Sequence, residues 1–429
     1  MTLYPHQEEA LKLTRNLKRV AYYYDMGLGK TFIGSEKMVE IGNRVNLLIC
    51  QKSKINDWKL HFETYYPNIF VIDYRKSQIS AEDIVLYSAH STVVVIINYE
   101  LAWRREELTR LTEFTLILDE SSMIQNPTAK QTRFIIKKLH EDSCILLSGT
   151  PCGGKFENLW TQAQLLGVDM TKREFEENFI NFEIIKGFGG FPVRIVDRKN
   201  PYKNTEYLKT VLRANGAIFM KTEEVMTLPE QRFINIFCPI TSDYRKFKKD
   251  RVLELEDKEF VGSTSFSYRL GLRMLASGYS KLKLEAFRDL ISSTSDRLIV
   301  FYNFNHELEA LKKIAQEQDR PISVMSGNLK DLRAYETEAN SITFCQYQAG
   351  AMGLNLQKAN KMIYFSLPER SELFEQSKKR IHRIGQKNTC TYYVLQTASS
   401  IDQLIYRALE KKQDYTDELF RKELNYRED

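Results

Sequence analysis

The chain lacks two features that would mark a membrane or exported protein. No stretch approaches the length of uninterrupted apolar sequence that a bilayer span needs. The start of the chain has no signal-peptide pattern, because Arg15, Lys18 and Arg19 lie within a helical pattern with a polar face. We therefore expect a protein without a membrane partner that stays in the cytoplasm.

Clustered cysteines and histidines are also missing. The six cysteines are scattered without any CxxC pair, and the six histidines are equally dispersed. Several of the cysteines fall within apolar, strand-like runs. This distribution favours buried free thiols in a reducing compartment over disulfides. It also provides no ligand set for a zinc site.

A strong surplus of one charge sign is absent as well. The net charge is only +6, a mild excess that is compatible with a polyanionic partner without requiring one. Hydrophobic residues make up 43% of the chain and charged residues 28%, the proportions of a soluble globular protein. At 429 residues the chain is too long for one ordinary core, so we expect two or three domains.

The first motif is a glycine-containing turn, Tyr24-Asp-Met-Gly-Leu-Gly-Lys-Thr31, between a strand expected at 20–24 and a helix expected at 32–41. Such a turn gathers backbone N–H groups at a helix N-terminus, where an anion binds. The full phosphate-loop pattern has a glycine where Tyr24 stands. We predict a bound triphosphate, with the Thr31 hydroxyl on a magnesium ion. The predicted nucleotide contacts are Met26, Gly27, Leu28, Gly29, Lys30 and Thr31.

The second motif is an apolar strand that ends in two adjacent carboxylates, Leu116-Ile-Leu-Asp-Glu-Ser-Ser122. We predict that Asp119 holds the hydrated magnesium ion and that Glu120 orients and deprotonates the attacking water. Another strand and turn follow at 145–151, where the Ser148 and Thr150 hydroxyls are expected to hydrogen-bond the acidic pair. Taken alone, that last segment is an ordinary turn.

Short β-branched runs alternate with helical patterns through the first part of the chain, at 46–50, 69–73, 93–97 and 114–118. Each run is bounded by polar or helical sequence, as buried parallel strands are. The alternation predicts a doubly wound α/β domain with ligands at the carboxyl ends of its strands. Upstream of the phosphate loop, the Gln7 amide offers a donor and an acceptor to an adenine edge.

A second alternating pattern begins at Arg297 and predicts a second parallel sheet. Between the two patterns, residues 184–196 favour a hairpin, and residues 242–280 favour mostly helical, basic structure. The strands expected in the second sheet lie at 298–302, 322–325, 342–346, 362–365 and 392–395.

Four motifs, in this order, resemble those of the Swi/Snf-type ATPases of helicase superfamily 2. They are Asp25-Met-Gly-Leu-Gly-Lys-Thr31, Asp119-Glu-Ser-Ser122, Ser148-Gly-Thr-Pro151 followed by Asn158-Leu-Trp160, and Gln376-Ser-Lys-Lys-Arg-Ile-His-Arg-Ile-Gly-Gln386. The resemblance implies two tandem RecA-like lobes, each a mostly parallel sheet with helices on both faces, plus helical insertions. We assign residues 1–170 to lobe 1, 171–230 to an inter-lobe segment and 231–429 to lobe 2, with the insertion near 242–280.

The last motif places Gln376, Arg380 and Arg383 at helical spacing i, i+4, i+7, on one face. The resemblance implies an arginine finger there, which would stabilise charge on the γ-phosphate in the transition state. It also implies a glycine loop at 349–356 that faces ATP, with Gly353 as a contact. Ser122 stands where the family has a histidine, so the coupling of hydrolysis to movement is open.

The resemblance also implies that strand-end loops grip nucleic-acid phosphates. In the first lobe these are Lys52 with Ser53 and Asn98 with Tyr99. Such a grip is independent of base sequence and sensitive to salt.

Together these features predict an ATP-dependent translocase or remodeller of double-stranded DNA, linear or branched, that uses ATP and Mg²⁺. A strand-separating DNA or RNA helicase of the same superfamily is one alternative. A non-catalytic nucleic-acid-binding scaffold and an ATPase that acts only on a protein partner are the others. We expect a monomer in the cytoplasm of a bacterium or a phage-infected cell.

Overall fold

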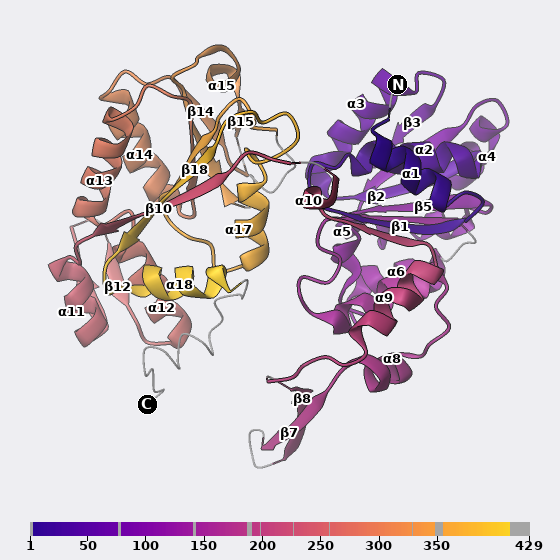
Figure 1. The fold of residues 1–429 in the computed structure, drawn as a ribbon, viewed down its shortest axis with the longest axis horizontal. Coiled ribbons are helices and arrows are strands. Elements are labelled where there is room, and N and C mark those ends of the chain that lie inside the picture. Colours follow the sequence, from indigo (N-terminus) through magenta and orange to yellow (C-terminus); the bar gives the residue numbers. More distant parts are fainter. Residues whose placement is uncertain are drawn as a thin grey trace. The chain divides into compact units, whose positions relative to one another are not determined.

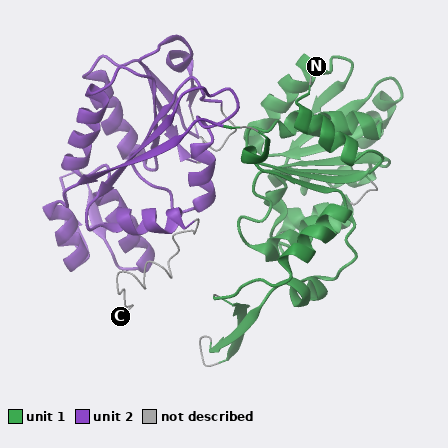
Figure 2. Cartoon of the chain, in the orientation of Figure 1, with its two compact units in different colours: residues 1–227 green, residues 228–429 purple. Residues whose placement is uncertain are grey.

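The computed structural model describes residues 3–75, 79–139, 143–186, 191–197, 199–225, 227–256, 258–327, 329–347 and 355–411. The chain forms two compact units, residues 1–227 and residues 228–429 (Figure 2). In the described part of the chain, each unit is built around one seven-stranded sheet with helices packed on it (Figure 1). This architecture confirms the predicted α/β class with two tandem lobes.

In the first unit, all neighbouring strands that the structure describes in the large sheet are parallel. Most of these strands are buried on both faces, which is why they read as continuous apolar runs. In sheet order they are β3 (Phe70–Asp73), β4 (Val93–Asn98), β2 (Val45–Cys50), β5 (Phe114–Asp119), β6 (Ser143–Ser148), β1 (Arg19–Tyr24) and β9 (Ala217–Met220). Their carboxyl ends lie at one edge, so the loops after β1, β5 and β6 meet there.

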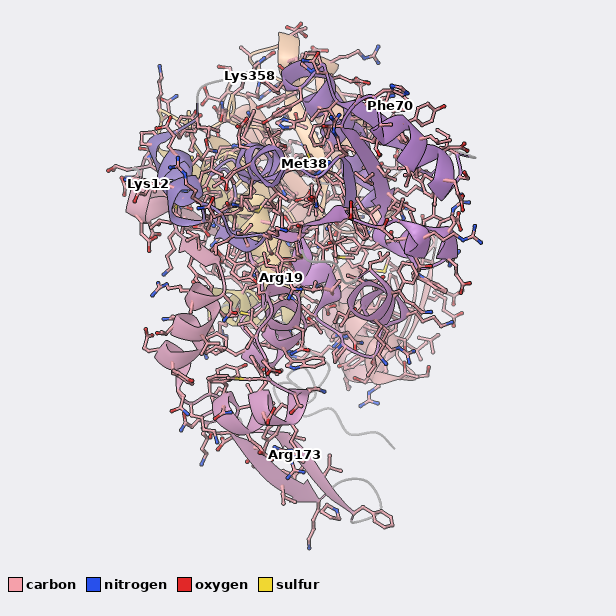
Figure 3. The ribbon with its side chains drawn as sticks, turned by 90° about the vertical axis from the view of Figure 1, so that its right-hand side faces the viewer. Lys12, Arg19, Met38, Phe70, Arg173 and Lys358 are labelled. Carbon is pink, nitrogen blue, oxygen red and sulfur yellow. The ribbon has the colours of Figure 1, made fainter. Side chains whose placement is uncertain are left out.

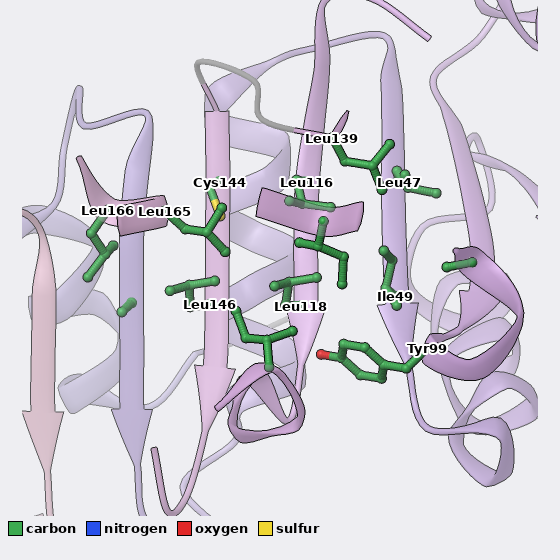
Figure 4. Packing of buried hydrophobic residues seen from close by; sticks show 14 of the residues in the cluster. Leu47, Ile49, Tyr99, Leu116, Leu118, Leu139, Cys144, Leu146, Leu165 and Leu166 are labelled. Atoms are coloured by element: carbon green, nitrogen blue, oxygen red, sulfur yellow. The ribbon is translucent and has the colours of Figure 1, made fainter. Parts of the chain in front are cut away.

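Helices cover both faces of this sheet (Figure 1). The helices that the structure describes in this unit are α1 (Pro5–Leu13), α2 (Lys30–Ile41), α3 (Ile55–Tyr65), α4 (Ala81–Ser88), α5 (Tyr99–Ala102), α6 (Lys130–Lys138), α7 (Trp160–Leu166), α8 (Lys172–Phe179), α9 (Thr205–Ala214) and α10 (Thr222–Val225). Short 3₁₀ turns lie between them: η1 (Lys52–Lys54), η2 (Glu106–Arg110), η3 (Ser121–Ile124) and η4 (Phe156–Leu159). Figure 4 shows the buried cluster on one face, where Leu47, Leu116, Leu146 and Leu165 come from different elements.

A two-stranded hairpin projects from the first unit beside α8 (Figure 1). It consists of β7 (Phe182–Lys186) and β8 (Pro192–Val196), which pair antiparallel, so the hairpin predicted at 184–196 is confirmed. The preceding helix begins with a capping box, in which the Thr171 hydroxyl accepts from the Glu174 N–H at 3.3 Å. Arg173 of the same helix lies next to the base of the hairpin, away from Lys12 of α1 and Met38 of α2 (Figure 3).

In the second unit, the sheet is parallel except at one edge, where β14 and β15 are antiparallel. In sheet order its strands are β10 (Gln231–Cys238), β18 (Cys390–Thr397), β17 (Lys361–Tyr364), β13 (Leu298–Tyr302), β16 (Ile342–Gln346), β14 (Ile322–Met325) and β15 (Lys330–Asp331). The helices described here are α11 (Ser242–Asp250), α12 (Ser265–Leu275), α13 (Lys281–Ser292), α14 (Asn305–Gln316), α15 (Arg333–Thr337), α17 (Ser371–Lys378) and α18 (Ile401–Glu410).

The segment that we assigned between the lobes joins the first unit through its edge strand. β9 pairs with β1 from Ala21↔Ala217 to Tyr24↔Met220, and the two units divide between Thr227 and Leu228. The expected helical stretch at 242–280 contains a small hairpin, β11 (Val252–Glu254) with β12 (Glu259–Val261), between its two helices.

Two other sequence features can be compared with the structure. The cysteines are all free thiols, and Cys152 is partly exposed while the rest are buried, which agrees with the expected buried thiols. Among the helices that the structure describes, none is long and apolar enough to cross a membrane.

Candidate ATP site

The phosphate loop leaves β1 and ends where α2 begins. Gly27 and Gly29 have φ angles of 93° and 77°, a region that residues with a Cβ rarely enter, so glycine suits both turns. The loop makes Lys30 the first residue of α2, at a helix N-terminus that attracts anions. The Lys30 ammonium donates to the Tyr24 carbonyl oxygen at 3.0 Å, which holds its charge against the loop.

Asp25 joins the start of this loop to the neighbouring edge strand. Its backbone N–H donates to the Met220 carbonyl oxygen at 3.0 Å. Its carboxylate Oδ2 accepts from the Thr222 backbone N–H at 3.2 Å and from the Thr222 hydroxyl at 3.3 Å. Because Thr222 is the first residue of α10, Asp25 links the phosphate loop to the last helix before the unit boundary.

Gln7 reaches the phosphate loop from α1, and its side chain is 1% exposed. Its amide nitrogen donates to the carbonyl oxygens of Leu28 and Gly29 at 3.2 and 3.1 Å. Its amide oxygen accepts from the Tyr4 N–H at 2.9 Å. Gln7 therefore braces the loop through protein atoms, and its contact with an adenine edge stays a prediction.

The acidic pair lies at the carboxyl end of β5. The Trp58 indole N–H donates to Asp119 Oδ2 at 2.7 Å, so the carboxylate predicted to hold magnesium has a fixed orientation. Glu120 has φ 54° and ψ 59°, the left-handed region that non-glycine residues seldom adopt. The buried Tyr99 hydroxyl donates to the carbonyl oxygens of Asp119 and Glu120 at 3.0 and 3.5 Å. Burial raises the pKa of Tyr99 well above its ordinary value, so the phenol stays a donor.

Strand β6 brings the lysine and the acids to one place, because it lies between β1 and β5. Its residues Ser148 and Leu147 pair with Tyr23 and Asp119, which sets the three strand ends level. A Cβ at Gly149 would lie 3.3 Å from Lys30 Nζ, so the turn after β6 passes close to the lysine. The buried Ser148 hydroxyl accepts from the Thr150 N–H at 3.2 Å, and its predicted contact with the acidic pair stays a prediction.

The four residues predicted to grip nucleic acid lie at the ends of the adjacent strands β2 and β4. Lys52 is exposed and Ser53 partly exposed, so both side chains are accessible to a ligand. Asn98 is 6% exposed and donates to Glu100 Oε2 at 2.6 Å. The Tyr99 ring is fully buried and its hydroxyl donates to the Asp119 carbonyl oxygen, so its predicted contact with nucleic acid stays a prediction.

In the second unit, the prediction that Gln376, Arg380 and Arg383 share one helical face is wrong. Helix α17 ends at Lys378, so only Gln376 lies on it. After the helix the chain continues in turns, in which the Lys378 carbonyl oxygen accepts from the His382 N–H at 3.2 Å and from the Tyr392 hydroxyl at 3.0 Å, and the Leu356 N–H donates to the Arg380 oxygen at 3.1 Å. The predicted contact Gly353 lies outside the described residues.

The two arginines have different environments. The side chain of Arg380 is 1% exposed, which makes it one of the largest fully buried side chains. Arg383 is partly exposed, and burial of the rest of its guanidinium lowers its pKa. Gln376 is also partly exposed and donates to Glu372 Oε1 at 3.1 Å.

The end of the same motif organises the backbone of the second unit. His382 Nε2 lies 2.8 Å from the Pro229 carbonyl oxygen, which anchors the chain where this unit begins. Gln386 donates to the carbonyl oxygens of Gln357 and Ala359 at 3.1 and 2.9 Å. Gly385 has φ 93°, and a Cβ there would lie 3.0 Å from Gln357 Nε2, so this glycine permits the close approach.

Sequence reasoning missed two residues of the site, Trp58 and Gln162. Trp58 lies in a helical pattern that gives no sign of a polar partner, and that partner, Asp119, is 61 residues away. Gln162, in α7, accepts from the Ser121 hydroxyl at 2.7 Å and donates to the Pro151 carbonyl oxygen at 2.6 Å. A glutamine in a largely apolar helical pattern is the one signal that could have indicated Gln162, because a buried polar side chain needs a hydrogen-bond partner.

Comparisons with protein families give the same assignment along most of the chain. Residues 6–278 match the SNF2-related domain, and residues 282–385 match the helicase conserved C-terminal domain. An uncharacterised ATP-dependent helicase of Mycoplasma pneumoniae is 24% identical over 461 residues, which cover 98% of this chain and 42% of that protein. The putative ATP-dependent helicase/translocase YwqA of Bacillus subtilis is 24% identical over 446 residues, which cover 93% of this chain and 46% of that protein.

More distant proteins are also similar. The human DNA excision repair protein ERCC-6 is 22% identical over 460 residues, which cover 92% of this chain and 30% of that protein. The solved structure of the Sulfolobus solfataricus SWI2/SNF2 ATPase core in complex with dsDNA is 19% identical, with a TM-score of 0.45, and the match covers 98% of this chain and 92% of that one. This chain spans less than half the length of the three relatives above. Because the SNF2-related match covers more than half of the chain, the chain belongs to the SNF2-related family of helicase superfamily 2.

Proposed function

We propose that this chain is an ATP-dependent translocase on double-stranded DNA. The observation that carries the proposal is the convergence of Lys30, Asp119 and Glu120 at adjacent strand ends of the first sheet. A lysine at a helix N-terminus suits the β- and γ-phosphates of a nucleotide, and a carboxylate pair beside it suits the metal ion and the attacking water.

The residues around the acidic pair suit a magnesium ion. Mg²⁺ prefers oxygen donors and is usually held by one or two carboxylates together with substrate phosphates and water. Asp119 supplies such a carboxylate, and Thr31 supplies a hydroxyl one residue after Lys30. Within the described residues, no group of three or more His, Cys, Asp or Glu side chains is arranged to hold a metal alone. When bound with ATP, the ion would neutralise charge that develops on the phosphates.

Glu120 would act as the base that orients the attacking water. Its partly buried carboxyl group follows a strand end, and its backbone is fixed by Tyr99. From the second unit, Arg383 is the better candidate for an arginine finger, because its side chain is partly exposed whereas that of Arg380 is buried. Gln376, on the helix before them, would support the same site.

Duplex DNA as the partner is supported by the family and by the activities named for its relatives. These include a helicase/translocase and a DNA excision repair protein. The exposed Lys52 and the adjacent Ser53 suit contacts with phosphates that do not depend on base sequence. The proposal also includes branched duplexes as substrates, a monomeric state, and a cytoplasmic location in a bacterium or phage-infected cell.

The test is ATP turnover with linear duplex DNA, single strands and RNA, each over a range of salt concentrations. We expect duplex DNA to stimulate turnover and salt to weaken the stimulation. Glu120→Gln should lower kcat by about 10²- to 10⁴-fold, and Lys30→Ala should abolish turnover, while both variants still bind DNA. Turnover that is indifferent to duplex DNA would contradict the proposal.

A displaced labelled strand would favour the alternative of a strand-separating helicase. Binding of nucleic acid without any turnover by the unaltered chain would favour a non-catalytic scaffold. Forks and junctions compared with linear duplex in the same turnover assay would identify the preferred DNA structure.

A further inference from the structure

A buried hydrogen-bond chain connects the acidic turn to the turn after β6. The Ser121 hydroxyl donates to Gln162 Oε1 at 2.7 Å, and Gln162 Nε2 donates to the Pro151 carbonyl oxygen at 2.6 Å. The two side chains that form these hydrogen bonds, those of Ser121 and Gln162, are 0% exposed. Water cannot replace a hydrogen bond that is lost in such a buried environment, so each of these two bonds strongly constrains the position of the turn that it holds.

The residue next to this chain is Glu120, whose backbone is in the left-handed region at φ 54°. For a residue with a Cβ, this conformation is less favourable than the right-handed one. Such a conformation persists only where surrounding contacts impose it. On one side, the Tyr99 hydroxyl donates to the carbonyl oxygens of Asp119 and Glu120. On the other side, Ser121 is held by Gln162.

A second set of contacts makes the anchor of Gln162 rigid. Gln125, just after η3, donates to the same Pro151 oxygen at 3.4 Å. Asn158 donates to Gln125 Oε1 at 3.0 Å and to the Cys152 carbonyl oxygen at 3.2 Å. The two turns that flank the acidic pair are therefore tied together through amide side chains, with Gln162 the buried link.

We propose that Gln162 is a positioning residue for hydrolysis: by holding Ser121 against the Pro151 turn, it keeps Glu120 in its left-handed conformation. This inference rests on the proposed function for its chemical consequence, because Glu120 is the proposed base. It also identifies a role for Ser121, which follows directly after the proposed base.

A neighbouring glutamine shows what an ordinary structural glutamine does in the same helix. Gln164 donates to the carbonyl oxygens of Val168 and Met170 at 3.1 and 2.7 Å. Both acceptors lie just after α7, so Gln164 closes its own helix end and touches neither turn of the site. Gln162 differs because its two partners come from the turns that flank the acidic pair.

The experiment compares Ser121→Ala, Gln162→Leu, the double variant and the control Gln164→Leu, all in the full chain. ATP turnover gives kcat and KM, and thermal unfolding reports the folded fraction. Amide hydrogen exchange over residues 120–124 is measured without ATP, so it reports the turn whether or not the chain hydrolyses ATP.

We expect Gln162→Leu to lower kcat by about tenfold to hundredfold, as small misplacements of reacting groups do. KM for ATP should change less than about twofold in the same variant, because the residues that bind ATP in its ground state are unaltered. Ser121→Ala should act in the same direction, and the double variant should lose no more than the more severe single one, since both remove the same link. Exchange over residues 120–124 should accelerate in these variants and stay unchanged in Gln164→Leu.

Unchanged exchange and unchanged kcat in folded Ser121→Ala and Gln162→Leu would overturn the proposal. Multiplicative losses in the double variant would also overturn it, since they would mean that the two side chains act independently. An unaltered chain without ATP turnover would contradict the proposed function instead, and the exchange comparison would still decide whether Gln162 holds the turn.

Discussion

Replacing Trp58 with phenylalanine tests the claim that Asp119 is oriented for a metal ion. The substitution removes the indole N–H that donates to Asp119 Oδ2 at 2.7 Å. It keeps an aromatic ring in a position where Trp58 stacks on Phe62 at a centroid distance of 5.7 Å and lies edge-on to His61. The perturbation is therefore close to the loss of one hydrogen bond.

The size of the effect follows from the kind of hydrogen bond. A bond to a charged group contributes about 1.5–3 kcal/mol, and about 1.4 kcal/mol corresponds to a factor of ten. Loss of a hydrogen-bond partner that orients a metal ligand costs about 10- to 100-fold in affinity or activity. We expect the Mg²⁺ concentration for half-maximal ATP turnover to rise by about tenfold or more in Trp58→Phe.

The assay is ATP turnover at fixed ATP and increasing Mg²⁺, with Trp160→Phe as the matched control. Trp160 also donates its indole N–H, at 3.2 Å, but to the Met170 carbonyl oxygen rather than to the acidic pair. We expect this control to keep the Mg²⁺ dependence of the unaltered chain. The same dependence in Trp58→Phe as in the unaltered chain, or an equal shift in Trp160→Phe, would refute the reasoning.

Two further predictions concern stability. In urea unfolding, Gly29→Ala should destabilise the chain more than Gly154→Ala. Both glycines have positive φ, but a Cβ at Gly29 would lie 2.2 Å from Gln7 Nε2, whereas one at Gly154 has nothing within 4 Å. Equal losses of unfolding free energy in the two variants would contradict this steric explanation. Burial lowers the pKa of His61 from 6.5 to about 4, so the unfolded chain binds this proton first as pH falls. The free energy of unfolding should therefore decline from pH 6.5 towards pH 4 by at most about 1.4 kcal/mol per pH unit, a figure that solvent near the ring roughly halves. His61→Phe should flatten this dependence on pH. An unchanged slope in the variant would contradict the assignment to His61.

Buried strands are the part of the fold that the sequence predicts best. The ranges expected for β13, β14 and β16 agree with the structure residue for residue, because short runs rich in apolar and β-branched residues between polar segments are typical of buried strands. Edge strands are harder to predict. β10 is mostly exposed along its length, and its mixed sequence Gln-Arg-Phe-Ile-Asn-Ile-Phe-Cys carries no continuous apolar run.

The candidate site was predictable where its chemistry lies in contiguous motifs. The order of β1, β6 and β5 brings the phosphate loop and the acidic pair together, as ligand sites at the carboxyl ends of parallel strands require. The bonds from Trp58 and Gln162 were not predictable, because each joins residues more than 10 positions apart in sequence. Helical spacing failed at Arg380 because α17 ends at Lys378, and contacts from distant residues, such as the Leu356 N–H to the Arg380 oxygen, hold the segment after it in turns.

The bond between Asp25 and Thr222 has a mechanical consequence. The carboxylate that opens the phosphate loop also anchors the first turn of α10, and α10 ends two residues before the first unit does. If phosphate binding changes the conformation of this loop, the bond from Asp25 would transmit the change to α10, the helix just before the boundary between the two units.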